Sequence, residues 1–452
     1  MSFSFNLISL GCPKNQVDSE EMFTGLKNVG IKFVNSSDAC DVCVINTCGF
    51  IEAAREESIG VIMEIIQKKQ NGSPKYIVVT GCMVNNNLAV LKDELPEVDL
   101  FLSTFDEHKI VKEITALSGK KNIKKNSGDL KKFEREHFNL EKTAYIKISE
   151  GCNRTCSFCT IPSIRGRFKS RPMDEIKKEA EYLAQSGVKE LIIVSQDSSC
   201  YGMDLNIKNG LYKLLRELVR VKDISWIRIL YLYPKSSLFT NELISIIRDE
   251  EKILKYIDMP IQHISGNVLN LMKRGDTGRD INMLIQKLKD GIENITLRTS
   301  LIVGFPGETD SDFEKLLKFI KDVKFDNMGV FKYSDEESTL SFEYPAELKI
   351  NSRIKNERYR LLMETQKGLL PEISSKHVGK TYMSIIDEVG DKTIKARTYF
   401  QSPDVDGCTY LYTGNSKDGP EIKLKKGFLP VKITKIKDYD LLGTYEALKS
   451  LD

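Results

Sequence analysis

The sequence predicts an α/β protein in three parts: a flavodoxin-like open sheet, a central partial (β/α) barrel and a small antiparallel β-barrel. Two observations support this prediction. Through the first two thirds of the chain and beyond, short apolar runs alternate with helical segments, as in parallel sheets with helical crossovers. From about residue 375 only short alternating runs remain, which is typical of a small barrel.

Charge and composition narrow the class of protein. Lys+Arg and Asp+Glu number 67 and 64, and a net charge of +3 is too small to indicate nucleic acid or a membrane surface. No apolar run approaches the ~20 residues of a membrane span, and the first residues lack the regions of a signal peptide. The ten cysteines therefore indicate metal binding or catalysis in a reducing, cytoplasmic compartment.

Residues 1–118 are expected to form the first domain, in which strands and helices alternate. Strands are expected at Phe3–Leu10, Asp41–Thr47 and Tyr76–Thr80, and helices start near Asp18, Ile51 and Asn86. Residues 119–140 are rich in lysine, asparagine and glycine, and we expect them to form a solvated linker.

A cysteine with a neighbouring glycine follows each of these three strands: Cys12, Cys48 and Cys82. The carboxyl ends of parallel strands share one edge of a sheet, so the three thiols should converge there. Glycine permits the close backbone turns that this requires. Three thiolates could hold an iron–sulfur cubane with one open iron. The alternative is that these cysteines are small buried apolar residues.

Three further cysteines, Cys152, Cys156 and Cys159, lie within eight residues of one another after the alternating run Tyr145–Ser149. This spacing also suits a cubane cluster with one open iron. A zinc site would need a fourth ligand nearby, and neither Cys nor His recurs before Cys200. The pattern therefore favours a second cluster over zinc or a disulfide.

Residues 141–374 are expected to contain six buried strands joined by helical crossovers, and hence a partial barrel. These strands are Tyr145–Ser149, Glu190–Ser195, Trp226–Leu232, Tyr256–Met259, Thr296–Val303 and Asn327–Phe331. Functional residues should lie in the loops beyond their carboxyl ends.

Residues 375–452 are expected to form the small barrel. Its alternating runs are Thr381–Ile386, Thr393–Thr398, Thr409–Thr413 and Val431–Lys437. The segment has 13 basic and 11 acidic residues, fewer positive charges than a domain that grips RNA normally shows. We expect Asp404 and Asp406, on one loop, to face a basic partner.

The Cys152–Cys159 loop resembles that of the radical S-adenosylmethionine (radical SAM) enzymes, and the last domain resembles the TRAM domain. Two cysteine triads in this order resemble the methylthiotransferases over nearly the whole chain. The resemblance implies two 4Fe–4S clusters and S-adenosylmethionine as cofactors. It also implies binding of adenine by Phe158 and Ile302, of the amino group by Gln196 and Asp197, and of carboxylate and ribose by Arg298 and Ser300. For Gln196 and Asp197 the alternative role is a helix cap.

Within this family, four segments resemble the branch that modifies the β-carbon of an aspartate in ribosomal protein S-twelve: Ser9–Asn15, Ile161–Gly166, Tyr231–Pro234 and Ser402–Gly407. The tRNA-modifying branch usually has Gln and Met in place of Pro13 and Lys14. The resemblance implies ribosomal protein S-twelve as substrate, a reductase such as flavodoxin or ferredoxin, and no membrane or tRNA partner. A tRNA methylthiotransferase and a non-catalytic iron–sulfur RNA-binding regulator are the alternatives.

Overall fold

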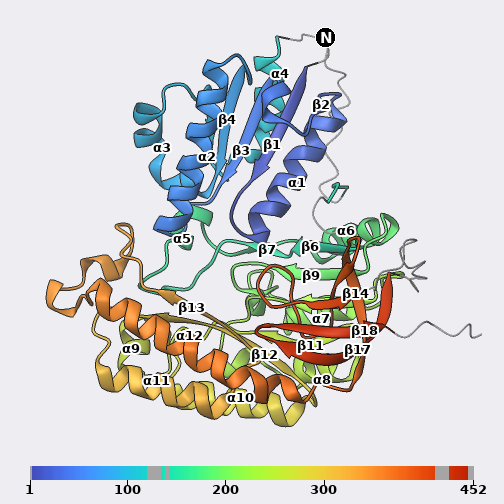
Figure 1. The fold of residues 1–452 in the computed structure, drawn as a ribbon. Helices are drawn as coiled ribbons and strands as arrows, with labels where there is room; N and C mark the ends of the chain where they lie inside the picture. The colour runs from blue at the N-terminus through green and yellow to red at the C-terminus, as the bar shows by residue number, and fades with distance from the viewer. Residues whose placement is uncertain (1–2, 120–133, 138–141, 413–426, 446–452) are drawn as a thin grey trace, which may run out of the picture.

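The computed structural model describes residues 3–119, 134–137, 142–412 and 427–445. It has three parts, an N-terminal five-stranded sheet, a central six-stranded sheet and a closed C-terminal barrel. In Figure 1 the N-terminal sheet lies above the short elements α5 (Ile161–Arg165) and β7 (Ser149–Glu150), and the red C-terminal barrel lies against the central sheet.

The N-terminal sheet is parallel throughout and has the strand order β2-β1-β3-β4-β5. This order is that of a flavodoxin-like sheet, the class of sheet predicted from the sequence. Its strands are β1 (Ser4–Ser9), β2 (Lys32–Phe33), β3 (Val42–Thr47), β4 (Tyr76–Gly81) and β5 (Leu100–Leu102). The three strands expected from apolar runs are confirmed, whereas β2 and β5 were not predicted because they are two and three residues long.

Helices cover both faces of this sheet. They are α1 (Pro13–Asn28), α2 (Glu52–Gln70), α3 (Cys82–Glu94) and α4 (Ile110–Leu117). The prediction that the first helix starts near Asp18 is wrong, because it begins at Pro13 with Cys12 as its N-cap residue. Proline is favoured there since its fixed φ suits the first helical turn. Asp18 is instead buried in the middle of the helix.

The central sheet is parallel and open, with the order β13-β12-β11-β10-β9-β6. Its strands are β6 (Thr143–Lys147), β9 (Glu190–Val194), β10 (Trp226–Ile229), β11 (Ile253–Asp258), β12 (Thr296–Val303) and β13 (Asn327–Lys332). Its larger helices are α6 (Met173–Gln185), α7 (Gly210–Leu218), α8 (Asn241–Asp249), α10 (Gly278–Gly291), α11 (Asp310–Val323) and α12 (Ser352–Ser375). The main hydrophobic core lies between one face of this sheet and these helices. The expected partial barrel is confirmed.

The C-terminal barrel closes in the order β14-β15-β16-β18-β17. Its strands are β14 (Thr381–Val389), β15 (Thr393–Arg397), β16 (Thr409–Tyr412), β17 (Phe428–Lys437) and β18 (Asp440–Tyr445). All pairings are antiparallel except that of β16 with β18, a strand that was not predicted. Across the described part of the chain, no helix combines the length and apolar character needed to cross a membrane.

The inner face of the central sheet is covered from two directions. Val17 of α1, together with Ile385 and Phe428 of the C-terminal barrel, belongs to one buried apolar group with residues of that face. Phe428 packs edge-on against Trp226 at the start of β10, with ring centroids 4.8 Å apart. The open barrel is therefore shielded by the N-terminal domain and by the C-terminal barrel.

Part of the expected linker is buried. The side chain of Arg135 is 1% exposed and its Nε donates to Glu179 of α6 at 2.8 Å. The same guanidinium pairs with Glu20 of α1. Residues 134–137 thus connect the first two domains, and the rest of the expected linker, residues 120–133 and 138–141, lies outside the described residues.

The loop that contains Asp404 and Asp406 reaches the inner face of the central sheet. Asp406 accepts a hydrogen bond from the Tyr256 hydroxyl at 2.6 Å, and a carboxylate oxygen lies 3.3 Å from Arg298 Nε. Asp404 accepts from the Tyr145 hydroxyl at 3.2 Å. The expectation that both face a partner is wrong for Asp406, whose side chain is fully buried because Arg298 supplies a countercharge.

Glu190, at the start of β9, holds two buried arginines. Its carboxylate pairs with Arg228 and with Arg397 of the C-terminal barrel, each at 2.8 Å, and all three side chains are at most 2% exposed. Replacing Glu190 with alanine leaves both guanidinium groups without this partner. We expect Glu190→Ala to lower the free energy of unfolding by about 3–5 kcal/mol, as measured by urea denaturation.

Glu217 is the matched control because it also pairs with two cations, Lys177 and Arg220, but on the surface. We expect Glu217→Ala to leave the urea midpoint nearly unchanged, since exposed pairs contribute little. Equal effects of the two substitutions would contradict a stabilising role for the buried pairs.

Candidate active site at the domain interface

The first cysteine triad lies where three strands of the N-terminal sheet end. Cys12 caps α1, Cys48 follows β3, and Cys82 is the first residue of α3. A Cβ atom built on Gly11 would lie 2.7 Å from Cys48 Cβ, and one on Gly81 would lie 2.4 Å from the Thr47 carbonyl oxygen. Both glycines have positive φ, so the close approach of these strand ends requires glycine at both positions.

The three thiols of this triad influence one another. Burial raises the pKa of the Cys48 thiol, and the neighbouring Cys12 raises it further. Burial also raises the pKa of Cys82 to about 12, although the nearby Arg165 guanidinium lowers it. Metal binding would remove these protons, because the thiolate is the ligand. The donor set therefore fits a metal cluster.

The second triad lies on the loop that follows β7. Cys152 N donates to the Gly166 carbonyl at 3.1 Å, and a Cβ on Gly151 would lie 2.3 Å from the Arg167 carbonyl oxygen. Burial raises the pKa of Cys159 to about 12, and the charges of Cys156 and Cys152 add to this effect. The three thiols of this loop therefore also lie within electrostatic reach of one another.

The number of thiols at each site bears on the choice between a cluster and a zinc ion. All ten cysteines lie within the described ranges, and none forms a disulfide. Among the described residues, no group of three or more His, Cys, Asp or Glu side chains is close enough to bind one metal ion. Zinc needs four ligands around one ion, whereas a cubane places each thiolate on a different iron. Each triad supplies three thiols, one fewer than a four-coordinate zinc site needs.

Three of the expected cofactor-binding residues share one face of β12. Arg298, Ser300 and Ile302 are partly exposed, while the residues that alternate with them are buried toward the helices. Ile302 and Phe158 also belong to one apolar group with Phe305. The structure thus brings Phe158, at the second triad, next to the residues of β12.

Gln196 has an unused acceptor beside the second triad. Its Nε2 donates to Glu150 at 2.8 Å, but its Oε1 is buried and has no hydrogen-bond partner among the described residues. A buried unpaired carbonyl oxygen is costly unless a ligand donates to it. The residue present therefore fits the ammonium group of S-adenosylmethionine.

Asp197 and Arg298 already have partners. Asp197 caps the 3-10 helix η3 (Ser198–Cys200) by accepting from Ser199 N at 3.2 Å, and it accepts from Arg154 Nε at 2.8 Å. The helix-cap alternative therefore describes Asp197 in this structure. Arg298 donates to Asp258 at 2.8 Å in addition to its pair with Asp406. A guanidinium has five N–H groups, so further donors remain for a ligand.

A buried ionic network extends from Cys82 of the first triad to Glu150, two residues before Cys152 of the second. Arg165 Nε lies 3.2 Å from Cys82 Sγ, and its Nη1 lies 2.7 Å from Asp18 and 3.4 Å from Glu150. Lys147 pairs with the same two carboxylates, at 2.8 Å from Glu150. Burial alone would raise the pKa of Asp18, but the two cations outweigh it and hold the pKa below its usual value. Sequence analysis missed this network, since its members are far apart in the chain.

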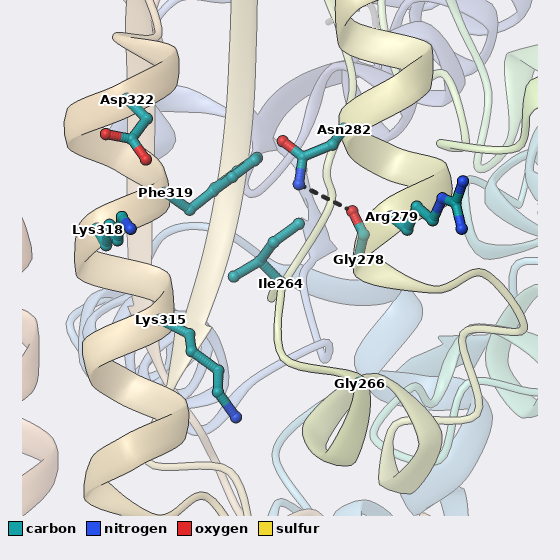
Figure 2. Close-up of a pocket in the computed structure, with 9 residues that line it drawn as sticks. All are labelled: Ile264, Gly266, Gly278, Arg279, Asn282, Lys315, Lys318, Phe319 and Asp322. Carbon is teal, nitrogen blue, oxygen red and sulfur yellow. Dashed lines mark hydrogen bonds between the residues drawn. The ribbon is translucent and has the colours of Figure 1, made fainter.

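The surface of the described residues includes two pockets near the central sheet. One, of about 230 Å³, adjoins the second triad, and its charged lining residues are four cations and one carboxylate: Arg154, Lys235, Lys273, Arg274 and Asp276. Arg274 Nη1 lies 3.7 Å from Cys156 Sγ. The other, of about 430 Å³, lies between α10 and α11, with Asn282 donating to the Gly278 carbonyl at 3.1 Å (Figure 2). It opens on the helical layer, whereas the expected cofactor residues are on the inner face of the sheet.

Three family models match the chain in succession. Residues 4–103 match the Uncharacterized protein family UPF0004, residues 146–320 match the Radical SAM superfamily, and residues 378–445 match the TRAM domain. Solved structures support the fold. The radical SAM methyltransferase TsrM of Kitasatospora setae, with cobalamin and a 4Fe–4S cluster bound, has a TM-score of 0.55 and 15% identity, over 75% of this chain and 77% of that chain.

Fold and site together define a radical SAM enzyme with a second cysteine triad in its N-terminal domain and a C-terminal TRAM domain. Similar proteins named "Ribosomal protein uS12 methylthiotransferase RimO" are 41% identical in Geotalea uraniireducens and 42% identical in Clostridium botulinum (strain Hall). In both cases the match covers 97% of each chain. The chain belongs to this RimO family of methylthiotransferases. The family's cofactors are S-adenosylmethionine and two 4Fe–4S clusters.

Iron content tests the two triads. Anaerobically reconstituted protein should hold about eight irons, and replacing all three cysteines of either triad with alanine should leave about four. Loss of Cys152, Cys156 and Cys159 should also abolish cleavage of S-adenosylmethionine, because the open iron of that cluster would bind it. Loss of Cys12, Cys48 and Cys82 should leave uncoupled cleavage. Iron analysis and product chromatography measure both effects.

The remaining cysteines are the matched controls for these substitutions. We expect serine or alanine at Cys40, Cys43, Cys200 or Cys408 to leave the iron content unchanged, one substitution at a time. Full iron after loss of the first triad, or iron loss in a control, would overturn the ligand assignment.

The unused acceptor of Gln196 gives a further prediction. Gln196→Leu keeps a similar volume but removes Oε1, so we expect about tenfold weaker binding of S-adenosylmethionine to the cluster-loaded protein, measured by calorimetry. Gln185→Leu, at the exposed end of α6, should leave the affinity unchanged. Wild-type affinity in Gln196→Leu would rule out this contact.

Proposed function

We propose that this protein adds a methylthio group to the β-carbon of an aspartate in ribosomal protein uS12. The observation that carries the proposal is the buried ionic network that extends from the first triad, through Arg165, to Glu150, two residues before the second triad, in a member of the RimO family. Chemistry at either triad would thus occur beside the other.

The proposed roles follow the geometry. Cys12, Cys48 and Cys82 hold one cluster, and Cys152, Cys156 and Cys159 hold the other. The cofactor contacts are Phe158 and Ile302 for adenine, Gln196 for the amino group, Ser300 and Arg298 for ribose and carboxylate, and Asp197 as the cap that orients the Gln196 segment. When bound, the two clusters and S-adenosylmethionine would supply the reducing electron, the hydrogen-abstracting radical, and the sulfur and methyl that are transferred.

The chain's own residues exclude water and orient the reactants. Val17 of α1 covers the inner face of the sheet from one side, and Phe428 of the C-terminal barrel covers it from the other. The Arg165 guanidinium beside Cys82 supplies a positive charge and a hydrogen bond next to the sulfur ligands. Such contacts tune the potential of an iron–sulfur cluster.

We further propose that the chain divides into four segments. Residues 1–118 hold the first triad, 119–140 form a connection, 141–374 hold the second triad and the cofactor, and 375–452 bind the substrate.

The reductase would be an acidic electron carrier such as flavodoxin or ferredoxin. The cationic pocket that adjoins the second triad supports this, because opposite charge accelerates encounter. The reaction would take place in the cytoplasm.

Mass analysis of ribosomal protein uS12 from cells with and without this gene tests the proposed function. We expect one aspartate to carry a methylthio group in place of a hydrogen only when the gene is present. The purified, reduced enzyme should produce the same change in vitro while it cleaves S-adenosylmethionine.

Two other outcomes would contradict the proposal. A methylthiolated tRNA adenosine without any change in uS12 would indicate the tRNA-modifying alternative. The absence of S-adenosylmethionine cleavage in reduced, cluster-loaded protein would indicate the non-catalytic regulator. We expect neither, and the nearly balanced charge of residues 375–452 argues against a tRNA-gripping domain.

A further inference from the structure

Lys14 of α1 crosses the interface between the N-terminal domain and the central sheet. It lies two residues after Cys12 and is 9% exposed. Its Nζ is 3.5 Å from the Ser195 carbonyl oxygen and 3.5 Å from the centroid of the Tyr231 ring. Ser195 and Tyr231 follow β9 and β10, so Lys14 reaches from the first triad to the carboxyl ends of the barrel strands.

Lys14 differs from the neighbouring buried cations in having no carboxylate partner in the described part of the chain. Two other buried cations of this interface, Lys147 and Arg165, share the carboxylates Asp18 and Glu150. Within the described ranges, no carboxylate forms an ion pair with Lys14. Proteins rarely bury a cation without a countercharge, so this position suits an anion from outside the chain.

Tyr231 holds the ammonium group without neutralising it. Its φ of +62° is in the left-handed region, which non-glycine residues adopt at a cost in conformational energy. Its backbone N–H donates to Asp258 at 2.9 Å, which helps to fix the turn. A ring face attracts a cation but supplies no negative charge. One side of the Lys14 ammonium group therefore packs against the Tyr231 ring.

We propose that Lys14 binds the side-chain carboxylate of the substrate aspartate. This inference rests on the proposed function and names the group by which that substrate is recognised. The β-carbon is bonded directly to the carboxylate carbon, so a cation that fixes one also positions the other. Holding reacting groups in place in this way is a major source of catalytic rate. Lys14 is a positioning and specificity residue for the carbon that reacts.

A different role for Lys14 would be to offset the negative charge of a cluster bound at Cys12. The two roles differ in what they predict for substrate recognition. A carboxylate receptor distinguishes aspartate from the uncharged, nearly isosteric asparagine. A residue that only offsets cluster charge does not.

The test compares two synthetic peptides that span the modified site of uS12, one with the native aspartate and one with asparagine in its place. Their affinities are measured by fluorescence anisotropy on the anaerobic, cluster-loaded enzyme. We expect the wild type to bind the aspartate peptide roughly 10- to 100-fold more tightly, the range for hydrogen bonds to charged groups. Lys14→Met should bind both peptides equally, and Lys14→Arg should retain part of the preference.

Lys27→Met is the matched control, because Lys27 lies on the same helix but pairs on the surface with Glu136. It should leave both affinities unchanged. A Lys14→Met enzyme that keeps the full preference for aspartate would overturn the proposal, including when that enzyme has lost iron. Equal binding of both peptides by the wild type would overturn it without any variant. Failure of the proposed function can be told apart from failure of the Lys14 proposal, because uS12 would then not be modified at all.

Discussion

The arrangement of the two triads depends on buried charges that neither domain balances alone. Asp18 belongs to the N-terminal domain, whereas Lys147, Glu150 and Arg165 belong to the central one. Separating the domains would leave these groups without their partners across the interface, and a buried charge without a partner is costly. The orientation of one domain on the other is therefore set by electrostatics as well as by apolar contact. Arg135 extends the same principle, since it joins Glu20 of α1 to Glu179 of α6.

Much of the fold follows from local sequence patterns. Apolar runs such as Val42–Thr47 and Glu190–Val194 predict buried parallel strands, because sheets covered on both faces have little room for polar residues. The position of a Gly–Cys pair after each strand then predicts where thiols gather. The close approach at Gly11 and Gly81 bears out the physical reason for the glycines. Short strands such as β2 cannot be predicted in this way, because two residues are too few to show an alternating pattern of apolar and polar side chains.

Long-range ionic contacts could not be predicted in the same way. Asp18 and Arg165 are separated by 147 positions, and nothing in either neighbourhood identifies the other. Asp406 was expected at the surface, and its side chain is instead buried. Its polar loop is typical of a surface, yet Tyr256 and Arg298, from other parts of the chain, allow it to be buried. Partners of this kind become visible only when the fold has brought distant segments together.

The unequal spans of the two triads have a consequence for maturation. Cys152, Cys156 and Cys159 lie within eight residues, so a nascent peptide can present all three to an iron–sulfur donor before its barrel is complete. Cys12, Cys48 and Cys82 are separated by much longer loops, and closing those loops has an entropic cost that the folded sheet must already have met. On the proposed ligand assignment, loading of the first site therefore depends on prior folding of its domain. Loading of the second site can begin during synthesis.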